Sequence, residues 1–315
     1  MKFDIKNKVS LLLLILIFGN ISAFSQTVGI DGSLQKGLED ITKDFKGTVG
    51  VYVLNLKTQK SAGINADTIF PTASIVKVPI ILGLFDKIHK GELTLNDTLL
   101  YRDSRIYGGS GLMQFYKDST KTDLRTLAAL MITYSDNVTS IWSQELAGGG
   151  VEINGLMEKM GLKDTRVNSR TPGREELWKK YGWGQTTPRE MASLLVSLRN
   201  RQVISEAASD EIYRMMTNSF YTDYSLSQIP PYVQTAAKQG MVDRSRSELV
   251  MVNAPGGDYV FYIATKNNED DSWDYENEAW ELQRKISGYL WNFFEPDSSW
   301  KPASGAKELV RGLRY

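Results

Sequence analysis

The stretch that organises this chain reads SIVKVPIILGLFDKI and covers residues 74–88. It is apolar on nearly every side, which predicts a helix buried in a core. Ser74 and Lys77 stand three residues apart and share one face of that helix, so the lysine amine can reach the serine hydroxyl. Apolar surroundings push a lysine towards its neutral form, and a neutral amine beside a serine can act as its base.

This spacing alone does not establish a nucleophile and its base. Average composition predicts roughly one S-x-x-K match by chance in a chain of 315 residues. The same spacing recurs at Ser33/Lys36, Ser298/Lys301 and Ser304/Lys307. The pair at Ser74 therefore needs support from the rest of the sequence.

The chain contains one histidine and no cysteine. The only histidine, His89, follows Ser74 by fifteen residues on the predicted helix, roughly 22 Å away at 1.5 Å per residue. A Ser-His-Asp triad on Ser74 is thereby excluded, and His89 suits the C-terminal end of the helix. The absence of cysteine excludes disulfides, cysteine catalysis and thiolate metal sites.

The composition, 42% hydrophobic and 23% charged, is that of a globular protein with a sizeable core. Residues 1–25 differ, because three lysines precede a short apolar run and Ala23-Phe24-Ser25 suits cleavage before Gln26. We interpret this segment as a secretory signal peptide. The product is expected to be exported, periplasmic or extracellular, and to carry no lipid anchor, since no cysteine is present.

The charge balance limits the expected partners. The chain has 37 basic and 37 acidic residues, and loss of the signal peptide would remove three lysines and one aspartate, leaving a net charge of −2. No general attraction to nucleic acid or to a membrane follows from this balance. We expect a monomer that acts on a small molecule or a neutral polymer and uses no cofactor or metal.

Hydrophobic patterns predict an α+β fold with one sheet built from both chain ends and helices between them. Strands are expected at 49–54, 61–64, 233–238, 248–252 and 259–265. Helices are expected at 31–46, 74–89, 123–134, 137–148, 151–160, 188–201, 205–216 and 276–294. Two loops remain, at 91–121 and 165–186, and the second is long enough to suggest a functional role.

The same patterns divide the chain into four parts. The expected boundaries are a signal peptide at 1–25, a sheet domain at 26–66 and 222–295, an inserted helical domain at 67–221 and a polar tail at 296–315. A site would lie in the crevice between the two domains, where pockets prefer to form. The run Gly108-Gly109-Ser110-Gly111 is either a surface turn or a segment that approaches a ligand closely.

Three short motifs supply the parts that acyl transfer requires. Ser74 and Lys77 offer a nucleophile and its base. Ser135 and Asn137, at a break between two predicted helices, offer a second hydroxyl and an amide. The segment 238–240, Lys-Gln-Gly, ends a strand with a cation and a glycine. Acyl transfer needs a nucleophile, a base, a proton donor for the leaving nitrogen and positive charge near the developing anion.

In these motifs the chain resembles the class A β-lactamases and their serine-hydrolase relatives, which carry S-x-x-K, S-D-N and K-T-G. The resemblance covers about residues 30–295, S-D-N occurs once, and the intervals of 61 and 103 residues are similar to those of the family. The K-x-G pattern alone is weak, because Lys159-Met160-Gly161 also fits it. The resemblance implies the β-lactamase/D,D-peptidase-like fold, an antiparallel sheet flanked by helices and joined to an all-helical domain.

The resemblance implies three catalytic residues. Ser74 would be acylated by a β-lactam carbonyl, Lys77 would be its base or proton relay, and Ser135 would pass a proton to the ring nitrogen. The residues implied to bind substrate are Asn137, Lys238, Gln239, Gly240 and Met241. Among these, Asn137 would bind the substrate side-chain amide and Lys238 the substrate carboxylate. The backbone amides of Ser74 and Met241 would form the oxyanion hole.

The chain departs from the family pattern at two positions. Gln239 stands where the family has Thr or Ser to hold the substrate carboxylate, and Arg244 or Arg246 could compensate. Thr171, before Pro172, aligns with the glutamate of the long loop. Two nearby glutamates follow it in the chain, Glu175 and Glu176, but only a loop of different shape would bring either to Ser74.

Three functions therefore remain open. The first is a secreted β-lactamase that hydrolyses the β-lactam amide and so degrades an antibiotic. The second is a related serine hydrolase, a penicillin-binding peptidase acting on peptidoglycan-like amides or another amide or ester hydrolase, with slow deacylation. The third is a non-catalytic binding descendant, which the presence of Ser74, Lys77 and Ser135 argues against.

Overall fold

The computed structural model describes residues 28–302. Its helices are α1 Gly32–Thr42, α2 Lys77–His89, α3 Leu124–Thr133, α4 Asn137–Leu146, α5 Gly149–Lys159, α6 Glu175–Tyr181, α7 Pro188–Arg199, α8 Glu206–Met216 and α9 Glu278–Phe294. Its strands are β1 Gly29–Ile30, β2 Thr48–Asn55, β3 Lys60–Ile64, β4 Phe70–Pro71, β5 Thr98–Leu100, β6 Lys121–Asp123, β7 Arg166–Val167, β8 Gly184–Thr186, β9 Thr235–Val242, β10 Ser245–Val252 and β11 Tyr259–Lys266. The expected signal peptide and residues 303–315 of the expected tail lie outside the described residues.

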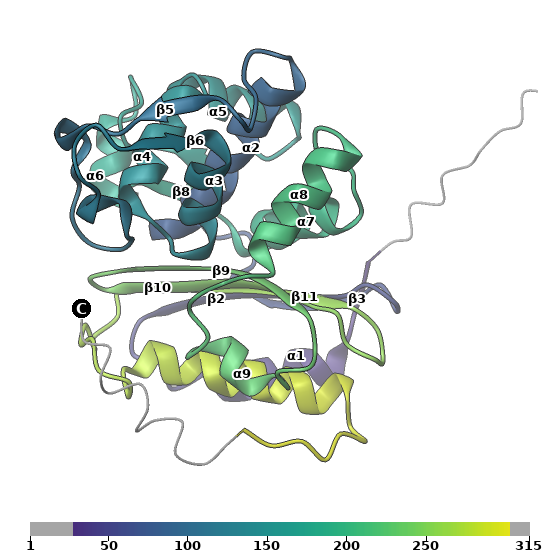
Figure 1. Ribbon diagram of the computed structural model, residues 1–315. Coiled ribbons are helices and arrows are strands. Elements are labelled where there is room, and N and C mark those ends of the chain that lie inside the picture. The colour runs from purple at the N-terminus through teal and green to yellow at the C-terminus, as the bar shows by residue number, and fades with distance from the viewer. Residues whose placement is uncertain (1–27, 303–315) are drawn as a thin grey trace, which may run out of the picture.

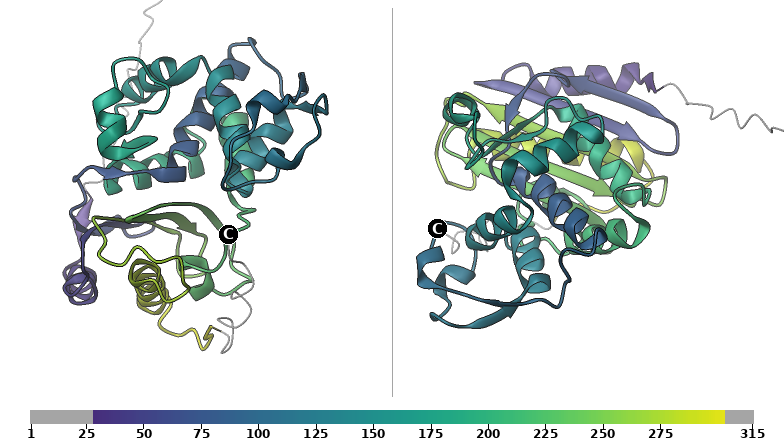
Figure 2. Two further views of the ribbon diagram at one scale, coloured as in Figure 1. Left: turned by 90° about the vertical axis from the view of Figure 1, so that its left-hand side faces the viewer. Right: turned by 90° about the horizontal axis from the view of Figure 1, so that it is seen from above.

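One six-stranded sheet joins the two ends of the chain in the order β1-β3-β2-β11-β10-β9. Its five long strands pair antiparallel, as the family resemblance implies, and β1 adds a short parallel edge beside β3. Figures 1 and 2 show this sheet as a layer between the helical region of the chain middle and the pair α1 and α9. The α+β fold with a sheet from both chain ends is thus confirmed.

Each face of the sheet has its own hydrophobic core. On one face Val51, Val53 and Phe261 pack with residues of α1 and α9, such as Leu38 and Ile286. On the other face, Tyr52, Tyr262 and Met251 join a larger cluster with buried side chains of α2, α3, α5, α7 and α8. The alternation of side chains along the strands separates the two cores, because successive residues point to opposite faces.

Helix α2 is the centre of the helical layer and is buried along most of its length. The first turn, Ala73–Val76, is a 3-10 turn, and the α-helix follows from Lys77 to His89. The residue Pro79 falls in the first turn of α2, where a missing backbone N–H is tolerated. The helix ends at His89, with Lys87 also in its last turn, so the expected C-terminal position of the histidine is confirmed.

The two predicted loops contain more structure than the sequence pattern indicated. Within 165–186 the chain forms β7, α6 and β8, and β8 pairs with both β7 and β4. Within 91–121 the strand β5 forms and pairs with β6. These elements are two to seven residues long and too short for a periodic pattern, so only their tertiary contacts define them.

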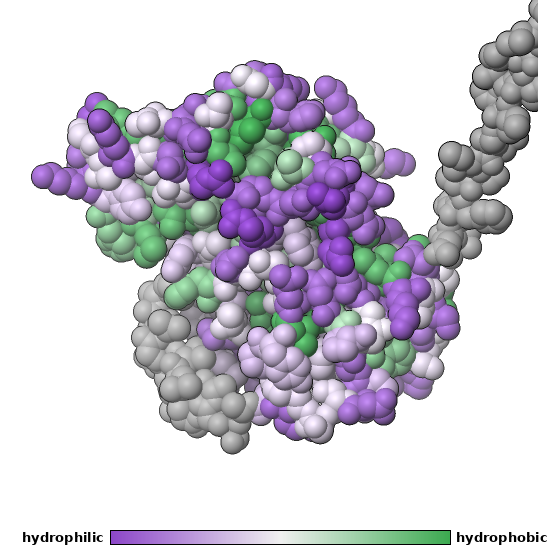
Figure 3. All heavy atoms as spheres, turned by 45° about the vertical axis from the view of Figure 1, so that its right-hand side comes forward, coloured by the Kyte–Doolittle hydropathy of each residue, from purple (hydrophilic) through white to green (hydrophobic). Residues whose placement is uncertain are grey.

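The surface mixes polar and apolar side chains. Figure 3 shows hydrophilic residues over much of one face, with hydrophobic residues in separate patches between them. Within residues 28–302, every helix is too short or too polar to cross a membrane.

Candidate active site

Ser74 lies in the 3-10 turn that precedes α2, where the chain passes close under strand β9. The preceding residue, Ala73, has a left-handed φ of 43°, which is a strained conformation for a residue with a side chain. A Cβ added at Gly240 would lie 2.4 Å from Thr72 O and 3.1 Å from Ile75 N. Only glycine therefore allows β9 to approach the serine turn this closely, which gives Gly240 of the K-x-G motif a physical reason.

Lys77 connects the first two motifs. Its Nζ lies 3.0 Å from Ser74 Oγ, 3.1 Å from Ser135 Oγ and 2.9 Å from Asn137 Oδ1, and it also donates to Ser135 O. Ser135 has a left-handed φ of 55° at the break between α3 and α4, which turns both of its oxygens towards the lysine. Residues 58 to 60 positions apart in the chain thus meet at one amine.

The hydrogen-bonding partners of Lys77 suit a neutral amine. Ser135 O and Asn137 Oδ1 can only accept, so they take two N–H donors, and the remaining lone pair can then face the Ser74 hydroxyl. Complete burial lowers the pKa of Lys77 from 10.5 to about 7, and the nearby Asp136 carboxylate partly opposes this shift. An amine of this pKa can accept the serine proton near neutral pH.

Lys238 approaches Ser135 from strand β9. Its Nζ lies 2.9 Å from Ser135 Oγ and donates to Gln239 O at 3.0 Å. Burial lowers the pKa of Lys238 well below its usual value, the charge of Lys77 lowers it further, and Glu248 opposes both effects. The Ser135 hydroxyl therefore bridges two buried lysines, which is a suitable position for passing a proton.

Asp136, the middle residue of S-D-N, has a role that the sequence did not reveal. Its Oδ1 caps α4 by accepting from Thr139 N at 2.9 Å, and its Oδ2 accepts from Leu112 N and Met113 N at 2.6 and 2.7 Å. A Cβ at Gly111 would lie 2.3 Å from Asp136 Oδ2. The glycine-rich run 108–111 therefore packs against the S-D-N break.

Asn137 is oriented by the same run. Its Nδ2 donates to Gly108 O at 3.0 Å while its Oδ1 faces Lys77, so the amide cannot rotate without losing both contacts. Neighbouring Ser110 accepts from Asn137 N through its backbone oxygen at 3.0 Å. Aspartate and serine are common capping residues at helix starts such as that of α4. The sequence therefore indicated a helix start here, but it did not indicate that the run 108–111 packs against it.

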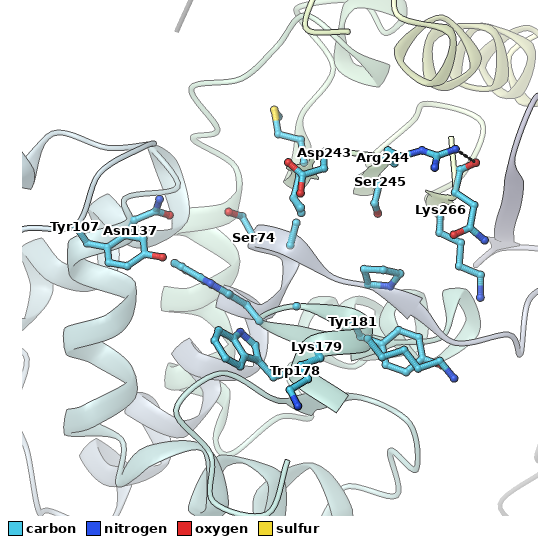
Figure 4. Close-up of a pocket in the computed structure, with 18 residues that line it drawn as sticks. Ser74, Tyr107, Asn137, Trp178, Lys179, Tyr181, Asp243, Arg244, Ser245 and Lys266 are labelled. Carbon is cyan, nitrogen blue, oxygen red and sulfur yellow. Dashed lines mark hydrogen bonds between the residues drawn. The ribbon is translucent and has the colours of Figure 1, made fainter. Parts of the chain in front are cut away.

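An open cleft of about 500 Å³ passes over Ser74. Residues from the helical layer and from the edge of the sheet line it: Pro71, Ala73, Ser74, Tyr107, Asn137, Trp178, Lys179, Lys180, Tyr181, Gly182, Trp183, Met241, Val242, Asp243, Arg244, Ser245, Lys266 and Asn267. Figure 4 shows Ser74 near the middle, with Asn137 and Tyr107 towards one end. A cleft is therefore present between the sheet and the helical layer, and Met241 is among the residues that line it.

Gln239 does not reach this cleft. It lies between Lys238 and Gly240 on β9, so its side chain points to the opposite face of the sheet, where it is 2% exposed. Its Nε2 has no hydrogen-bond partner among residues 28–302, and the residue directly opposite on β10 is Glu248. The expectation that the Gln239 side chain binds substrate does not fit this placement.

The two arginines proposed to compensate for Gln239 have different positions. Arg246 is fully buried, with its guanidinium 4.6 and 4.9 Å from the ring centres of Trp273 and Trp280, so it cannot contact substrate. Arg244 is exposed and lines the cleft. Of the two, only Arg244 is available to a ligand.

The position expected for a deacylating carboxylate is occupied by a buried threonine. Thr171 Oγ1 donates to Ser169 O at 3.1 Å, and its side chain packs so tightly on α5 that a Cβ at Gly150 would lie 1.8 Å from it. Glu175 and Glu176 begin α6 and are exposed, and Glu176 pairs with Lys179 at 2.6 Å. Neither glutamate lines the cleft.

An aromatic side chain that the sequence did not single out for the site lies beside the catalytic lysine. The Trp183 ring centre is 5.9 Å from Lys77 Nζ, and the ring meets Tyr107 edge to face at 5.5 Å. The Arg170 guanidinium covers both rings, at 5.5 Å from Tyr107 and 6.0 Å from Trp183. The ring helps to keep water away from the lysine.

Comparisons with known proteins find beta-lactamases among the similar sequences. Residues 33–294 match the family model described as the beta-lactamase enzyme family. The chain is 22% identical to beta-lactamase VEB-1 of Pseudomonas aeruginosa over 301 residues, covering 92% of this chain and 98% of that protein. It is 29% identical to an imipenem-hydrolyzing beta-lactamase of Enterobacter cloacae over 197 residues, covering 59% and 63%.

Two solved structures have a similar fold. PBP-A superposes with a TM-score of 0.75 at 26% identity, covering 85% of this chain and 97% of PBP-A. A beta-lactamase from Sphaerobacter thermophilus superposes with a TM-score of 0.74 at 20% identity, covering 84% and 98%. Because the family model spans most of the sequence and the fold agrees, the chain belongs to the class A beta-lactamase family.

Proposed function

We propose that this protein is an exported serine hydrolase that β-lactams acylate at Ser74, with cleavage of the amide bond of their ring. The observation that carries the proposal is the distance of 3.0 Å from Lys77 Nζ to Ser74 Oγ, in a site where Lys77 has a pKa of about 7. Lys77 takes the hydroxyl proton while Ser74 Oγ bonds to the carbonyl carbon. The C–N bond then breaks, and Ser135 passes a proton to the leaving nitrogen.

Support for export comes from the sequence alone. Residues 1–25 have the charged start, apolar run and small residues of a secretory signal peptide. A periplasmic or extracellular location follows from this interpretation, and it would bring the protein into contact with β-lactams or with peptidoglycan-like amides.

We further propose that deacylation limits turnover. Hydrolysis of an acyl-enzyme needs a base that activates water, and Thr171 offers a hydroxyl bonded to Ser169 O instead of a carboxylate. Asp243 is the one carboxylate that lines the cleft within the described residues. A β-lactamase with slow release is therefore the first candidate.

A second candidate is a penicillin-binding peptidase or related amide hydrolase. The threonine at position 171 favours it, as does the similarity to PBP-A. One similar structure is a PBP-A variant in an acyl-enzyme complex with penicillin G. Such an enzyme would be acylated by the drug and would process a peptide amide faster than a β-lactam.

Intact-protein mass, followed over time after mixing with benzylpenicillin, tests the proposal. We expect one adduct per chain within the burst, located at Ser74 by peptide mapping, and its slow loss as the penicilloate is released. Ser74→Ala should give no adduct, and Ser33→Ala, at another S-x-x-K match, is the matched control that should behave as the unmodified protein. An adduct that survives Ser74→Ala would refute the assignment.

The same experiment separates the two candidates. Continued release of hydrolysed penicillin indicates a slow β-lactamase. A stable adduct, together with cleavage of a D-alanyl-D-alanine peptide, indicates the peptidase.

A further inference from the structure

One end of the cleft carries positive charge that the proposed chemistry does not use. The charged residues that line the cleft as a whole are Lys179, Lys180, Arg244, Lys266 and the single carboxylate Asp243. The whole chain has equal numbers of basic and acidic residues, so this excess is local. In Figure 4, Arg244 and Lys266 lie at the end of the pocket opposite Asn137 and Tyr107, with Ser74 between them.

Arg244 and Lys266 are held in place by backbone carbonyls. Arg244 Nε donates to Asn268 O at 2.5 Å, and Lys266 Nζ donates to Ile69 O at 2.8 Å. Lys266 Nζ also lies 4.8 Å from the centre of the Phe70 ring. Neither cation pairs with a carboxylate within residues 28–302, so both charges are positioned and uncompensated.

Helix α6 brings two more cations to this cleft. Lys179 pairs with Glu176, whose side chain is 84% exposed, and solvent screens that pair. Lys180 Nζ lies 5.0 Å from the centre of the Tyr181 ring. A cleft lined by one sign of charge concentrates ligands of the opposite sign, because its walls have a low dielectric constant.

We propose that this cationic end, formed by Arg244 and Lys266, binds a carboxylate on the acyl side chain of the substrate. The preferred substrates would then be amides whose acyl part ends in a carboxylate. This inference rests on acylation at Ser74, and it concerns a second carboxylate. The first carboxylate is the one that the family resemblance assigns to Lys238, a fully buried lysine beside Ser135. Arg244 and Lys266, by contrast, line the open cleft.

Matched penicillins test the inference. Derivatives of 6-aminopenicillanic acid would be acylated with linear dicarboxylic acids from glutaric to suberic, each compared with the same chain ending in a primary amide. The two members of a pair differ only in the charge of the last group. The second-order rate constant for acylation of Ser74, from intact mass, is the measurement.

We expect the carboxylate member to acylate at least about tenfold faster at the best chain length, and this ratio to fall as salt is added. The double variant Arg244→Gln/Lys266→Gln should bring the ratio to about one. Both members keep the ring carboxylate, so a loss of rate that they share would report a contact of Arg244 with that group and does not enter the ratio. Lys117→Gln removes one exposed charge that does not line the cleft, and should leave the ratio unchanged.

The outcomes distinguish this inference from the proposed function. If both members of every pair acylate Ser74 at equal rates, the inference is wrong and the proposed function stands. A ratio that the double variant does not change would place the selectivity elsewhere and also overturn it. If no member forms an adduct at Ser74, the proposed function itself fails.

Discussion

At the scale of single residues, burial decides which proton transfers the site can perform. Lys77 and Lys238 are both fully buried, and the charge of Lys77 lowers the pKa of Lys238 further. Asp136 and Glu248 favour the charged forms, but burial remains the largest effect on both pKa values. Neutral Lys77, joined to Lys238 through the Ser135 hydroxyl, can take a proton from Ser74, and Ser135 can pass one to the leaving nitrogen.

The pH dependence of acylation should report this lysine. Only neutral Lys77 can accept the Ser74 proton, so the acylation rate should rise as pH increases through about 7 and level off above it. Lys77→Ala should slow acylation by about 10² to 10⁴ and remove that step from the profile. Rates from pH 5 to 9, measured by rapid-quench mass spectrometry, provide the check. An unchanged rate in Lys77→Ala would point to a carboxylate acting through water.

Thr171→Glu tests the missing deacylating base. A threonine hydroxyl cannot act as a base near neutral pH, so the unmodified protein should show a stoichiometric burst, then turnover far below the typical value of about 10 per second. The glutamate must displace the contact of Thr171 with Gly150 to reach the cleft, so circular dichroism first confirms that the variant folds. In the folded variant the added carboxylate should speed the slow phase by about tenfold or more and leave the burst rate nearly unchanged. Stopped-flow absorbance with benzylpenicillin resolves both phases.

Three carboxylate variants serve as controls for that measurement. Glu175→Gln and Glu176→Gln should have no effect, because neither residue lines the cleft. Asp243→Asn should have none either. Fast steady turnover of the unmodified protein that Asp243→Asn abolishes would identify Asp243 as the base and contradict the role given to Thr171.

At the scale of elements, Arg246 fixes the turn between β9 and β10. Its Nη1 donates to the carbonyl oxygens of Val242, Asp243 and Ser245, and its Nη2 donates to Ser272 O. Its guanidinium also lies against two tryptophan rings. One planar cation thus ties the turn that borders the cleft to the segment before α9.

Arg246→Met should therefore destabilise the protein. Methionine keeps an apolar stem but loses every hydrogen bond of the guanidinium, which we expect to lower the free energy of unfolding by about 3 kcal/mol. Arg244→Met is the matched control, because Arg244 is exposed, and it should cost less than about 1 kcal/mol. Urea denaturation followed by circular dichroism measures both values. Equal costs for the two variants would show that burial of Arg246 contributes little.

The elements also show what the sequence can and cannot predict. Long helices such as α7 and α9 could be predicted because their side-chain pattern extends over several turns and capping or acidic residues mark where each begins. The short elements between 165 and 186 were not, since contacts with distant residues define them. In the site, the contact of Ser74 with Lys77 follows from their local spacing. The face of the sheet to which the Gln239 side chain points depends on strand register, which only the folded sheet establishes.

At the scale of the whole molecule, the site lies where two layers share one core. Lys238 from the sheet bonds to Ser135 from the helical layer, and Lys77 joins Ser135 to Ser74. Beneath them a single hydrophobic cluster includes Met251 of the sheet and Leu194 of the helical layer. Separation of the layers would expose that cluster to water and free both lysines, so site and fold should be lost together.

The last prediction follows from this shared core. Met251 and Val250 are neighbours on β10 and fully buried, but Met251 belongs to the core shared with the helical layer, and Val250 to the core beneath α1 and α9. We expect the burst of Ser74 acylation and the far-ultraviolet circular dichroism to decline at the same urea concentration, as in a two-state transition. Met251→Ala should cost about 2 to 5 kcal/mol and Val250→Ala somewhat less, and each should shift both curves equally. If the acylation burst declined at a lower urea concentration than the circular dichroism signal, the helical layer would open on its own. If only Met251→Ala increased the difference between the two urea midpoints, that opening would occur at the shared core.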